Sequence, residues 1–132
     1  EDYAHHPTEI ASTLEAARWV APARIICVFQ PHLYSRTKFF QDEFAAVLAT
    51  ADRAIVTDIY ASREAPLAGV DSGLVVETAR AHGAQHVELL KDMHAVPAHL
   101  AQDLRPGDLV LVLGAGDINR IAPRIVEALR AG

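Results

Sequence analysis

The chain of 132 residues is 51% hydrophobic and carries a formal net charge of −5. This length and apolar content suit one compact domain and argue against wholesale disorder. The acidic balance also argues against a nucleic-acid partner, because domains that bind the phosphate backbone normally display a basic face.

Cys27 is the only cysteine, so no disulfide can form within the chain, and a reducing compartment is expected. It lies inside the apolar run of residues 24–29, which favours a buried, inert thiol over a nucleophile. No apolar stretch approaches the length of about eighteen residues that a membrane span needs. The acidic, histidine-rich start does not resemble a signal peptide. We therefore expect a cytoplasmic protein with no membrane partner.

The first half of the chain predicts a helix, a strand and a second helix. His-Pro-Thr-Glu at residues 6–9 is typical of a helix start, because proline suits the first helical position and glutamate favours the positive end of the helix dipole. Apolar residues then recur at helical spacing until Pro22 ends this helix. The β-branched run 24–29 predicts a strand buried on both faces, followed by a loop over 30–37 and a helix over 38–51.

The second half continues the alternation of strands and helices. Its pattern predicts strands over residues 53–59, 87–90 and 109–113, and helices over 74–82, 92–104 and 118–130. This order predicts an α/β fold, Rossmann-like, in which a mostly parallel sheet carries helices on both faces. Because no internal repeat or domain boundary interrupts the pattern, residues 1–132 are expected to form a single domain.

The edge where the strands end is the expected ligand site, because ligands of such sheets bind where loops meet helix N-termini. Arg36 is the sharpest candidate there, since a guanidinium grips a carboxylate or phosphate in a bidentate fork and a nearby helix N-terminus also favours anions. A solvated loop arginine is the alternative. The reactive side chains expected at this edge are Asp2, Tyr3, His5, His6, His32, Tyr34, Ser35, Arg36, Thr37, Asp58, Tyr60, Arg63, Glu64 and Asp117.

A zinc site built from His5, His6 and His32 with Asp58 is the metal alternative. Adjacent histidines at a helix start point in different directions, and no standard ligand spacing is present, so we expect no dedicated metal site. His6 can instead cap the helix. Four further histidines lie away from the strand ends and are interpreted as ordinary surface residues: His82, His86, His94 and His99.

Gly114-Ala-Gly116 resembles the start of a dinucleotide-binding fingerprint. Asn119 replaces the third glycine, and too little chain follows for the acidic ribose residue, so a bound nicotinamide is not expected. The glycines either let a ligand approach the backbone closely or form a bare tight turn. Nothing matches the phosphate-binding motif G-x-x-x-x-G-K-(S/T), so a bound ATP would take most of its phosphate contacts from elsewhere. Ser35 has no nucleophile-elbow context, which disfavours a serine hydrolase.

Two long motifs resemble those of the Mur ligases. Residues 1–9, Glu-Asp-Tyr-Ala-His-His-Pro-Thr-Glu, resemble the D-D-Y-(A/G)-H-H-P-T-E segment that opens the last domain of the Mur ligases acting on UDP-N-acetylmuramate and L-alanine. Residues 29–37, Phe-Gln-Pro-His-Leu-Tyr-Ser-Arg-Thr, are similar to the F-Q-P-H-(R/L)-Y-(S/T)-R-T loop of that domain. Residues 58–60, 69–71 and 114–118 follow in the family's order and spacing, so the resemblance spans essentially the whole chain.

The resemblance implies one domain of a three-domain, ATP-dependent amide-bond ligase of peptidoglycan synthesis. In this family the first domain binds the uridine nucleotide, and the central domain carries the P-loop and the Mg²⁺ ligands. Both would lie outside this chain, and the isolated domain should be inactive. ATP converts the muramoyl carboxylate into an acyl phosphate, which the amine of L-alanine attacks. The third domain closes over the central one, excludes water and positions the amine.

The family's functional residues carry over to matching positions. Asp2 would bind the ATP ribose, a role that suits a carboxylate because it can accept hydrogen bonds from two hydroxyls, and Tyr3 would lie beside the nucleotide. The resemblance assigns neither a catalytic residue nor a metal ligand to this domain. The positions that match the pocket for L-alanine and the reacting carboxylate are His5, His32, Arg36, Tyr60, Ala61 and Gly116.

The chain departs from the family pattern at two positions. Glu1 stands where the family often has aspartate, and Leu33 stands where many members have arginine. An anion contact from position 33 is therefore missing, so Arg36 or another domain must supply more of the attraction. Three alternatives remain open: a paralogous ligase that attaches a recycled murein peptide, a non-catalytic binding module, and a metal-dependent hydrolase. The His-Leu-Tyr-Ser-Arg loop resembles the L-alanine branch better than the recycling branch.

Overall fold

A four-stranded parallel sheet forms the centre of the domain. The computed structural model describes residues 5–131, so the predictions for Asp2 and Tyr3 lie outside the described residues. The strands follow one another across the sheet in the order β3-β2-β1-β4. Their bounds are β1 (Arg24–Phe29), β2 (Arg53–Val56), β3 (Val87–Leu89) and β4 (Asp108–Leu113). The predicted α/β fold is confirmed, and every strand pairing in this sheet is parallel.

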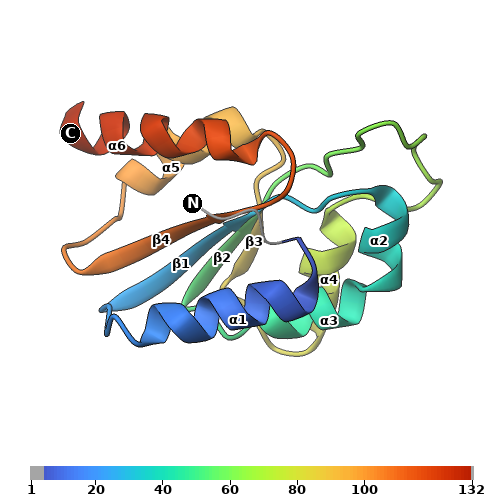
Figure 1. Cartoon of the computed structure of the whole chain (residues 1–132), viewed down its shortest axis with the longest axis horizontal. Coiled ribbons are helices and arrows are strands. Elements are labelled where there is room, and N and C mark those ends of the chain that lie inside the picture. The colour runs from blue at the N-terminus through green and yellow to red at the C-terminus, as the bar shows by residue number, and fades with distance from the viewer. Residues whose placement is uncertain (1–4, 132) are drawn as a thin grey trace.

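Helices cover both faces of the sheet (Figure 1). One face carries α1 (Pro7–Arg18), α3 (Gln41–Leu48) and α4 (Gly73–Ala81). The other carries α5 (Val96–Ala101) and α6 (Ala122–Ala131), preceded by the short 3₁₀ helices η1 (Met93–Ala95) and η2 (Ile118–Ile121). A further short helix, α2 (Tyr34–Phe39), follows β1. Within residues 5–131, no helix is both long and apolar enough to cross a membrane.

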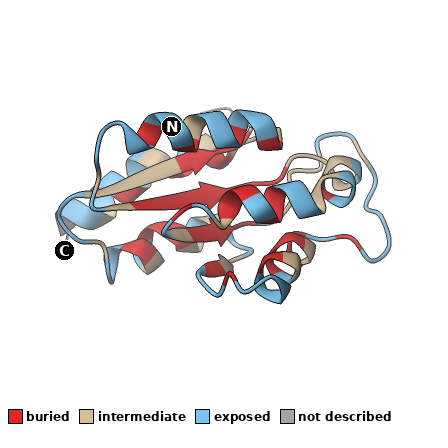
Figure 2. Cartoon of the chain, turned by 90° about the horizontal axis from the view of Figure 1, so that it is seen from below, coloured by how far each residue is buried: buried red, intermediate tan, exposed pale blue. Residues whose placement is uncertain are grey.

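The central strand β1 supplies both hydrophobic cores. Ile25, Cys27 and Phe29 face the core beneath α1, α3 and α4, whereas Ile26 and Val28 face the core beneath α5 and α6. All five side chains are fully buried, because a strand between two helical layers points its alternate side chains into one core or the other. Figure 2 shows the buried strands lying between the two layers of helices. Burial raises the pKa of the Cys27 thiol to about 12, which fits the predicted inert thiol.

The start of α1 confirms the cap predicted for His6. The Nδ1 atom of His6 accepts a hydrogen bond from the backbone N–H of Thr8 at 3.2 Å. In return, the carboxylate of Glu9 accepts a hydrogen bond from the backbone N–H of His6 at 3.1 Å. This reciprocal pair is a capping box, with a histidine in the position more often held by serine or threonine.

Several predicted elements are shorter or divided. The predicted loop 30–37 instead contains α2, and the predicted helix 38–51 is broken at Phe40, whose φ of −104° and ψ of 18° interrupt the helical path. The strand predicted over 53–59 ends at Val56. Beyond it the N–H of Thr57 donates to the carbonyl of Phe29 and the N–H of Asp58 donates to that of Lys91, so neither residue continues a regular ladder with one neighbour. The last two predicted helices begin with a 3₁₀ turn, and Pro97 fits the first turn of α5 because it needs no donor there.

An ion-pair network occupies the opposite edge of the sheet, where the strands begin. Arg53 pairs with Glu88 at 2.8 Å and with Asp103 at 2.7 Å. His99 Nε2 lies 3.2 Å from the carboxylate of Glu88 and 3.0 Å from Arg53 Nη2. The prediction that His99 is an ordinary surface residue is therefore wrong, because α5 carries it into this network.

Asp108 is expected to stabilise the domain in a pH-dependent way. Arg24 binds its carboxylate through two hydrogen bonds of 2.6 and 3.0 Å and, with the backbone N–H of Arg105, lowers the Asp108 pKa from 3.8 to about 2. A carboxyl whose folded pKa is depressed stabilises the fold above its unfolded pKa and loses that contribution as the pH falls through its folded pKa. Allowing for solvent screening at Arg24, this contribution is about 1–2 kcal/mol.

Urea unfolding of the wild-type chain and Asp108→Asn, followed by circular dichroism from pH 7 to pH 2, measures this contribution. The wild type should be more stable above pH 4, and its advantage should disappear between pH 4 and pH 2. Asp58→Asn is the matched control, because the side chain of Asp58 has no partner among residues 5–131 and its loss should change little. An advantage of the wild type that persists unchanged to pH 2 would contradict the assignment.

Candidate functional site

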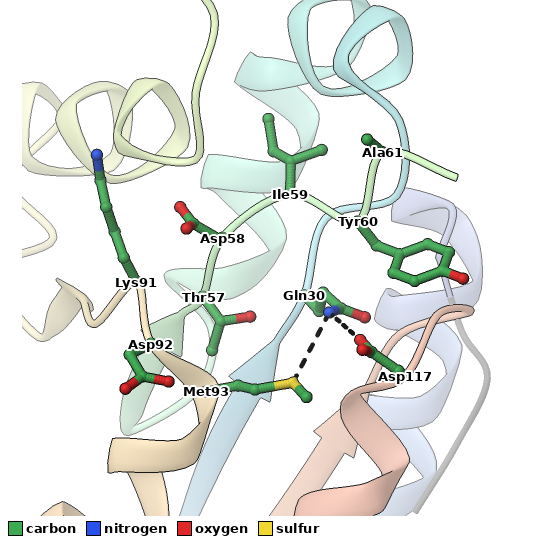
Figure 3. Close-up of a pocket in the computed structure, with 10 residues that line it drawn as sticks. All are labelled: Gln30, Thr57, Asp58, Ile59, Tyr60, Ala61, Lys91, Asp92, Met93 and Asp117. Atoms are coloured by element: carbon green, nitrogen blue, oxygen red, sulfur yellow. Dashed lines mark hydrogen bonds between the residues drawn. The ribbon is translucent and has the colours of Figure 1, made fainter. Parts of the chain in front are cut away.

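The candidate site lies at the carboxyl ends of the strands. From β1 the chain adds β2 and then β3 on one side of the sheet, whereas β4 lies on the other side of β1. The direction in which strands are added therefore reverses between β1 and β4. Open α/β sheets bind ligands at such a switch point. A pocket of about 500 Å³ opens there, and its walls include Gln30, Asp58, Tyr60, Met93 and Asp117 (Figure 3).

Backbone pairing brings the loops after β1 and β2 together. A parallel bridge joins His32 to Tyr60 beyond the ends of both strands. The N–H of Tyr60 donates to the carbonyl of Pro31 at 2.8 Å, and the N–H of Leu33 donates to the carbonyl of Tyr60 at 3.0 Å. The rings of His32 and Tyr60 consequently lie nearly parallel, at 15°, with centroids 5.8 Å apart. Two candidates from distant motifs are therefore neighbours.

His5 and Arg36 complete a cluster around His32. The ring of His5 meets that of His32 edge-on, with centroids 5.8 Å apart, and Arg36 Nη1 lies 3.3 Å from His32 Nδ1. A guanidinium can only donate, so Nδ1 of His32 must accept and carries no proton. Burial, with the positive charges of Arg36 and His5, lowers the pKa of His32 below its usual range. A neutral His32 thus orients the guanidinium of Arg36 without adding a charge.

The N-terminus of α2 is already occupied by a carboxylate. Glu64, from the loop after β2, accepts hydrogen bonds from the backbone N–H of Ser35 at 2.9 Å and from its hydroxyl at 2.5 Å. These two hydrogen bonds hold the pKa of the Glu64 carboxyl below its usual range. We expected a helix N-terminus near Arg36 to assist anion binding. Instead, Arg36 lies inside α2, whose N-terminus is satisfied by Glu64, so an anion here would be bound by the guanidinium and not by the helix N-terminus.

Gly116 allows the ring of Tyr60 to pack directly on the loop after β4. A Cβ atom at this position would overlap Cγ of Tyr60 and would lie 2.7 Å from Oε1 of Gln30. The sequence left close ligand approach and a bare tight turn as the two interpretations of these glycines. The structure gives Gly116 another use, because a side chain of the same domain takes the space that glycine leaves. Ala61, the remaining predicted substrate residue, is half-buried in the pocket wall.

The family model described as "Mur ligase, glutamate ligase domain" matches residues 1–116. The chain belongs to the Mur ligase family.

Relatives within the Mur ligases cover nearly all of this chain. The UDP-N-acetylmuramate–L-alanine ligase of Mycobacterium sp. (strain JLS) is 47% identical over an alignment that covers 99% of this chain and 27% of that protein. The crystal structure of UDP-N-acetylmuramate-alanine ligase from Thermotoga maritima has a TM-score of 0.79 at 26% identity, covering 99% of this chain and 26% of that one. The chain therefore spans about a quarter of the length of these proteins.

A third relative shares the fold. The crystal structure of a murein peptide ligase from Psychrobacter arcticus matches with a TM-score of 0.77, covering 98% of this chain and 26% of that one. At 23% identity this likeness shows the fold alone.

The histidines do not converge as the metal alternative requires. His6 uses Nδ1 to cap α1 and packs its ring against Phe40, with centroids 4.8 Å apart, whereas His5 turns to His32. Across residues 5–131, no group of three or more histidine, cysteine, aspartate or glutamate side chains is placed to hold a metal ion. This Mur ligase domain thus gathers His5, His32, Arg36, Tyr60 and Gly116 in one place and separates His6 from them.

Sequence reasoning missed Gln30, which lies at the centre of this edge. Gln30 is only 5% exposed, and its amide joins β1 to the loop after β4. The sequence feature that could have identified Gln30 is its position as a polar residue immediately after a run of apolar strand residues. Met93 and Lys91 in the pocket wall were also missed, because they follow the strand predicted over 87–90 and belong to no motif.

Proposed function

We propose that this chain is the carboxy-terminal domain of a cytoplasmic, ATP-dependent ligase that joins L-alanine to UDP-N-acetylmuramate in peptidoglycan synthesis. The other two domains of that ligase would lie outside the chain. The observation that carries the proposal is the convergence of His5, His32, Arg36 and Tyr60 at the carboxyl edge of a Mur ligase domain. A relative that is 47% identical bears the name of this activity.

The cluster suits the recognition of a small amino acid and a carboxylate. Arg36 contacts His32 through Nη1, and no other partner is found for its guanidinium among residues 5–131, so its remaining N–H groups can grip a carboxylate. Tyr60, supported by Gly116, would form the wall against which the acceptor amino acid lies. These contacts would hold the amine in one orientation, which lowers the entropic part of the barrier.

This chain would supply only part of the binding site for ATP and Mg²⁺. No P-loop motif is present in the sequence, and the α2 N-terminus is taken by Glu64, so the nucleotide phosphates and the metal would be held mainly by the central domain. When bound, ATP would supply the phosphoryl group that activates the muramoyl carboxylate. Asp2 and Tyr3 would contact the nucleoside, and closure of this domain would exclude water from the activated carboxylate.

Substrate preference tests the proposal against its two nearest alternatives. The full-length protein, given ATP, Mg²⁺ and UDP-N-acetylmuramate, should release ADP and form UDP-N-acetylmuramoyl-L-alanine when L-alanine is added. The tripeptide L-alanyl-γ-D-glutamyl-diaminopimelate should react at least about tenfold more slowly, since a site for alanine has no contacts that favour the longer chain. The opposite preference would identify a murein-peptide recycling ligase. A full-length protein that releases no ADP with either acceptor would be a non-catalytic binding module.

A further inference from the structure

We propose that Gln30 and Asp117 form a clamp that positions Gly116 and Tyr60, and through them the acceptor side of the site. This inference rests on the proposed function and extends it to two positioning residues. Both side chains line the pocket at the switch point between β1 and β4 (Figure 3).

The clamp joins the two strands on either side of the switch point. Gln30 Nε2 donates to Asp117 Oδ1 at 2.8 Å, and Gln30 Oε1 accepts from the backbone N–H of Ile118 at 3.3 Å. The Sδ atom of Met93 lies 4.0 Å from the same amide nitrogen. Both polar atoms of a nearly buried amide are therefore used, and both of these hydrogen bonds hold the loop that follows β4.

The loop held in this way carries the surface on which Tyr60 rests. Gly116 lies between the amide of Gln30 and the ring of Tyr60, and a Cβ atom there would collide with both. Any shift of the loop after β4 therefore moves the support of Tyr60. Tyr60 also lies against His32, which in turn contacts Arg36. The clamp therefore helps to position His32 and Arg36 as well as Tyr60.

The chemistry of the clamp favours positioning over simple packing. A hydrogen bond to an ionised carboxylate is shorter and stronger than one between neutral groups, and it fixes a direction that an apolar contact does not. A buried apolar side chain at position 30 would pack β1 against β4 equally well, but it would leave the loop after β4 free to shift. The amide fixes the loop because it acts as donor and acceptor at the same time.

A change of hydrogen-bond polarity tests the clamp in the full-length ligase. Gln30→Glu replaces the donor with a carboxylate that faces Asp117, so the KM for L-alanine should rise about fivefold while the KM for ATP changes little. The Tm should fall, because two carboxylates then meet at a nearly buried position. Combining Gln30→Glu with Asp117→Asn returns a donor, now from position 117 to position 30, and should restore the KM for L-alanine to within about twofold of the wild type. Gln102→Glu, an exposed change at the end of α5, is the matched control.

Hydrogen exchange supplies a readout that does not depend on activity. Amides of residues 114–121 should exchange faster in Gln30→Glu and recover their protection in the double variant. A wild-type enzyme that shows no reaction with L-alanine would defeat the proposed function while leaving this readout to decide on the clamp. The clamp is overturned if the double variant is no better than Gln30→Glu in exchange and in KM. It is also overturned if the KM values for L-alanine and ATP rise by the same factor, which is the pattern of a purely structural role.

Discussion

Replacing Arg36 by alanine is expected to lower kcat/KM of the proposed full-length ligase for L-alanine by about tenfold or more. Loss of a hydrogen bond to a charged group costs roughly 1.5–3 kcal/mol, which corresponds to this range. The effect should be large because Leu33 offers no second cation in the loop and the α2 N-terminus is occupied by Glu64. Arg36, which contacts His32 within the cluster, is therefore the side chain expected to bind the anion.

Steady-state kinetics of three variants measure this effect. Arg36→Lys should fall between the wild type and Arg36→Ala, because lysine keeps the charge but loses the bidentate fork. Arg124→Ala, which removes an exposed arginine from α6, is the control and should leave kcat/KM unchanged. Unchanged kinetics for Arg36→Ala would remove Arg36 from the site.

The titration of His32 gives an independent check on the same contact. Arg36 is the second cause, after burial, of the lowered pKa of His32. Arg36→Ala should therefore raise the pKa of His32 toward its usual value, although burial keeps part of the depression. An NMR titration of the ring protons would measure this change, and a pKa that does not rise would show that the contact with Arg36 is not maintained in solution.

The sequence predicts the framework of this domain well because the framework depends on local patterns. The strand over residues 24–29 is found with the predicted bounds, since the five consecutive apolar residues after Arg24 favour a short strand buried between two layers. The position of the site at the strand ends follows from the α/β order in the same way. His6 as a cap was also predictable, because its role needs only Thr8 and Glu9 nearby in the chain.

The contacts that shape the site could not be predicted, because they join segments far apart in the chain. Glu64 caps a helix that begins thirty positions earlier, and this cap allows α2 to start within the predicted loop. Gln30 reaches Asp117 across the switch point, a pairing that depends on how β4 lies against β1. Gln30 and Asp117 each lie in a motif, but neither motif says which side chains of the two segments meet, so only the assembled fold identifies these pairs.

Replacing Phe44 by alanine is expected to lower the free energy of unfolding by about 3–5 kcal/mol, because it removes a fully buried ring and leaves a cavity. Phe44 packs against Phe29 at the end of β1, with ring centroids 5.1 Å apart, and against Phe40, with centroids 6.2 Å apart. Phe40 in turn contacts the ring of His6 at the start of α1. This aromatic row therefore supports the segments that present His5 and His32.

Urea unfolding of the 132-residue chain measures this loss, and Phe39→Ala provides the matched control. Phe39 is 78% exposed on the neighbouring helix, so its removal should cost at most about 1 kcal/mol. If Phe44→Ala lowers the free energy of unfolding no more than Phe39→Ala does, the aromatic row does not stabilise the core on this face of the sheet. The expected difference follows from burial alone, since the two changes delete the same ring. In the full-length ligase, Phe44→Ala should also reduce activity at temperatures where the domain stays folded, because His5 and His32 are held in place by the segments that rest on this row.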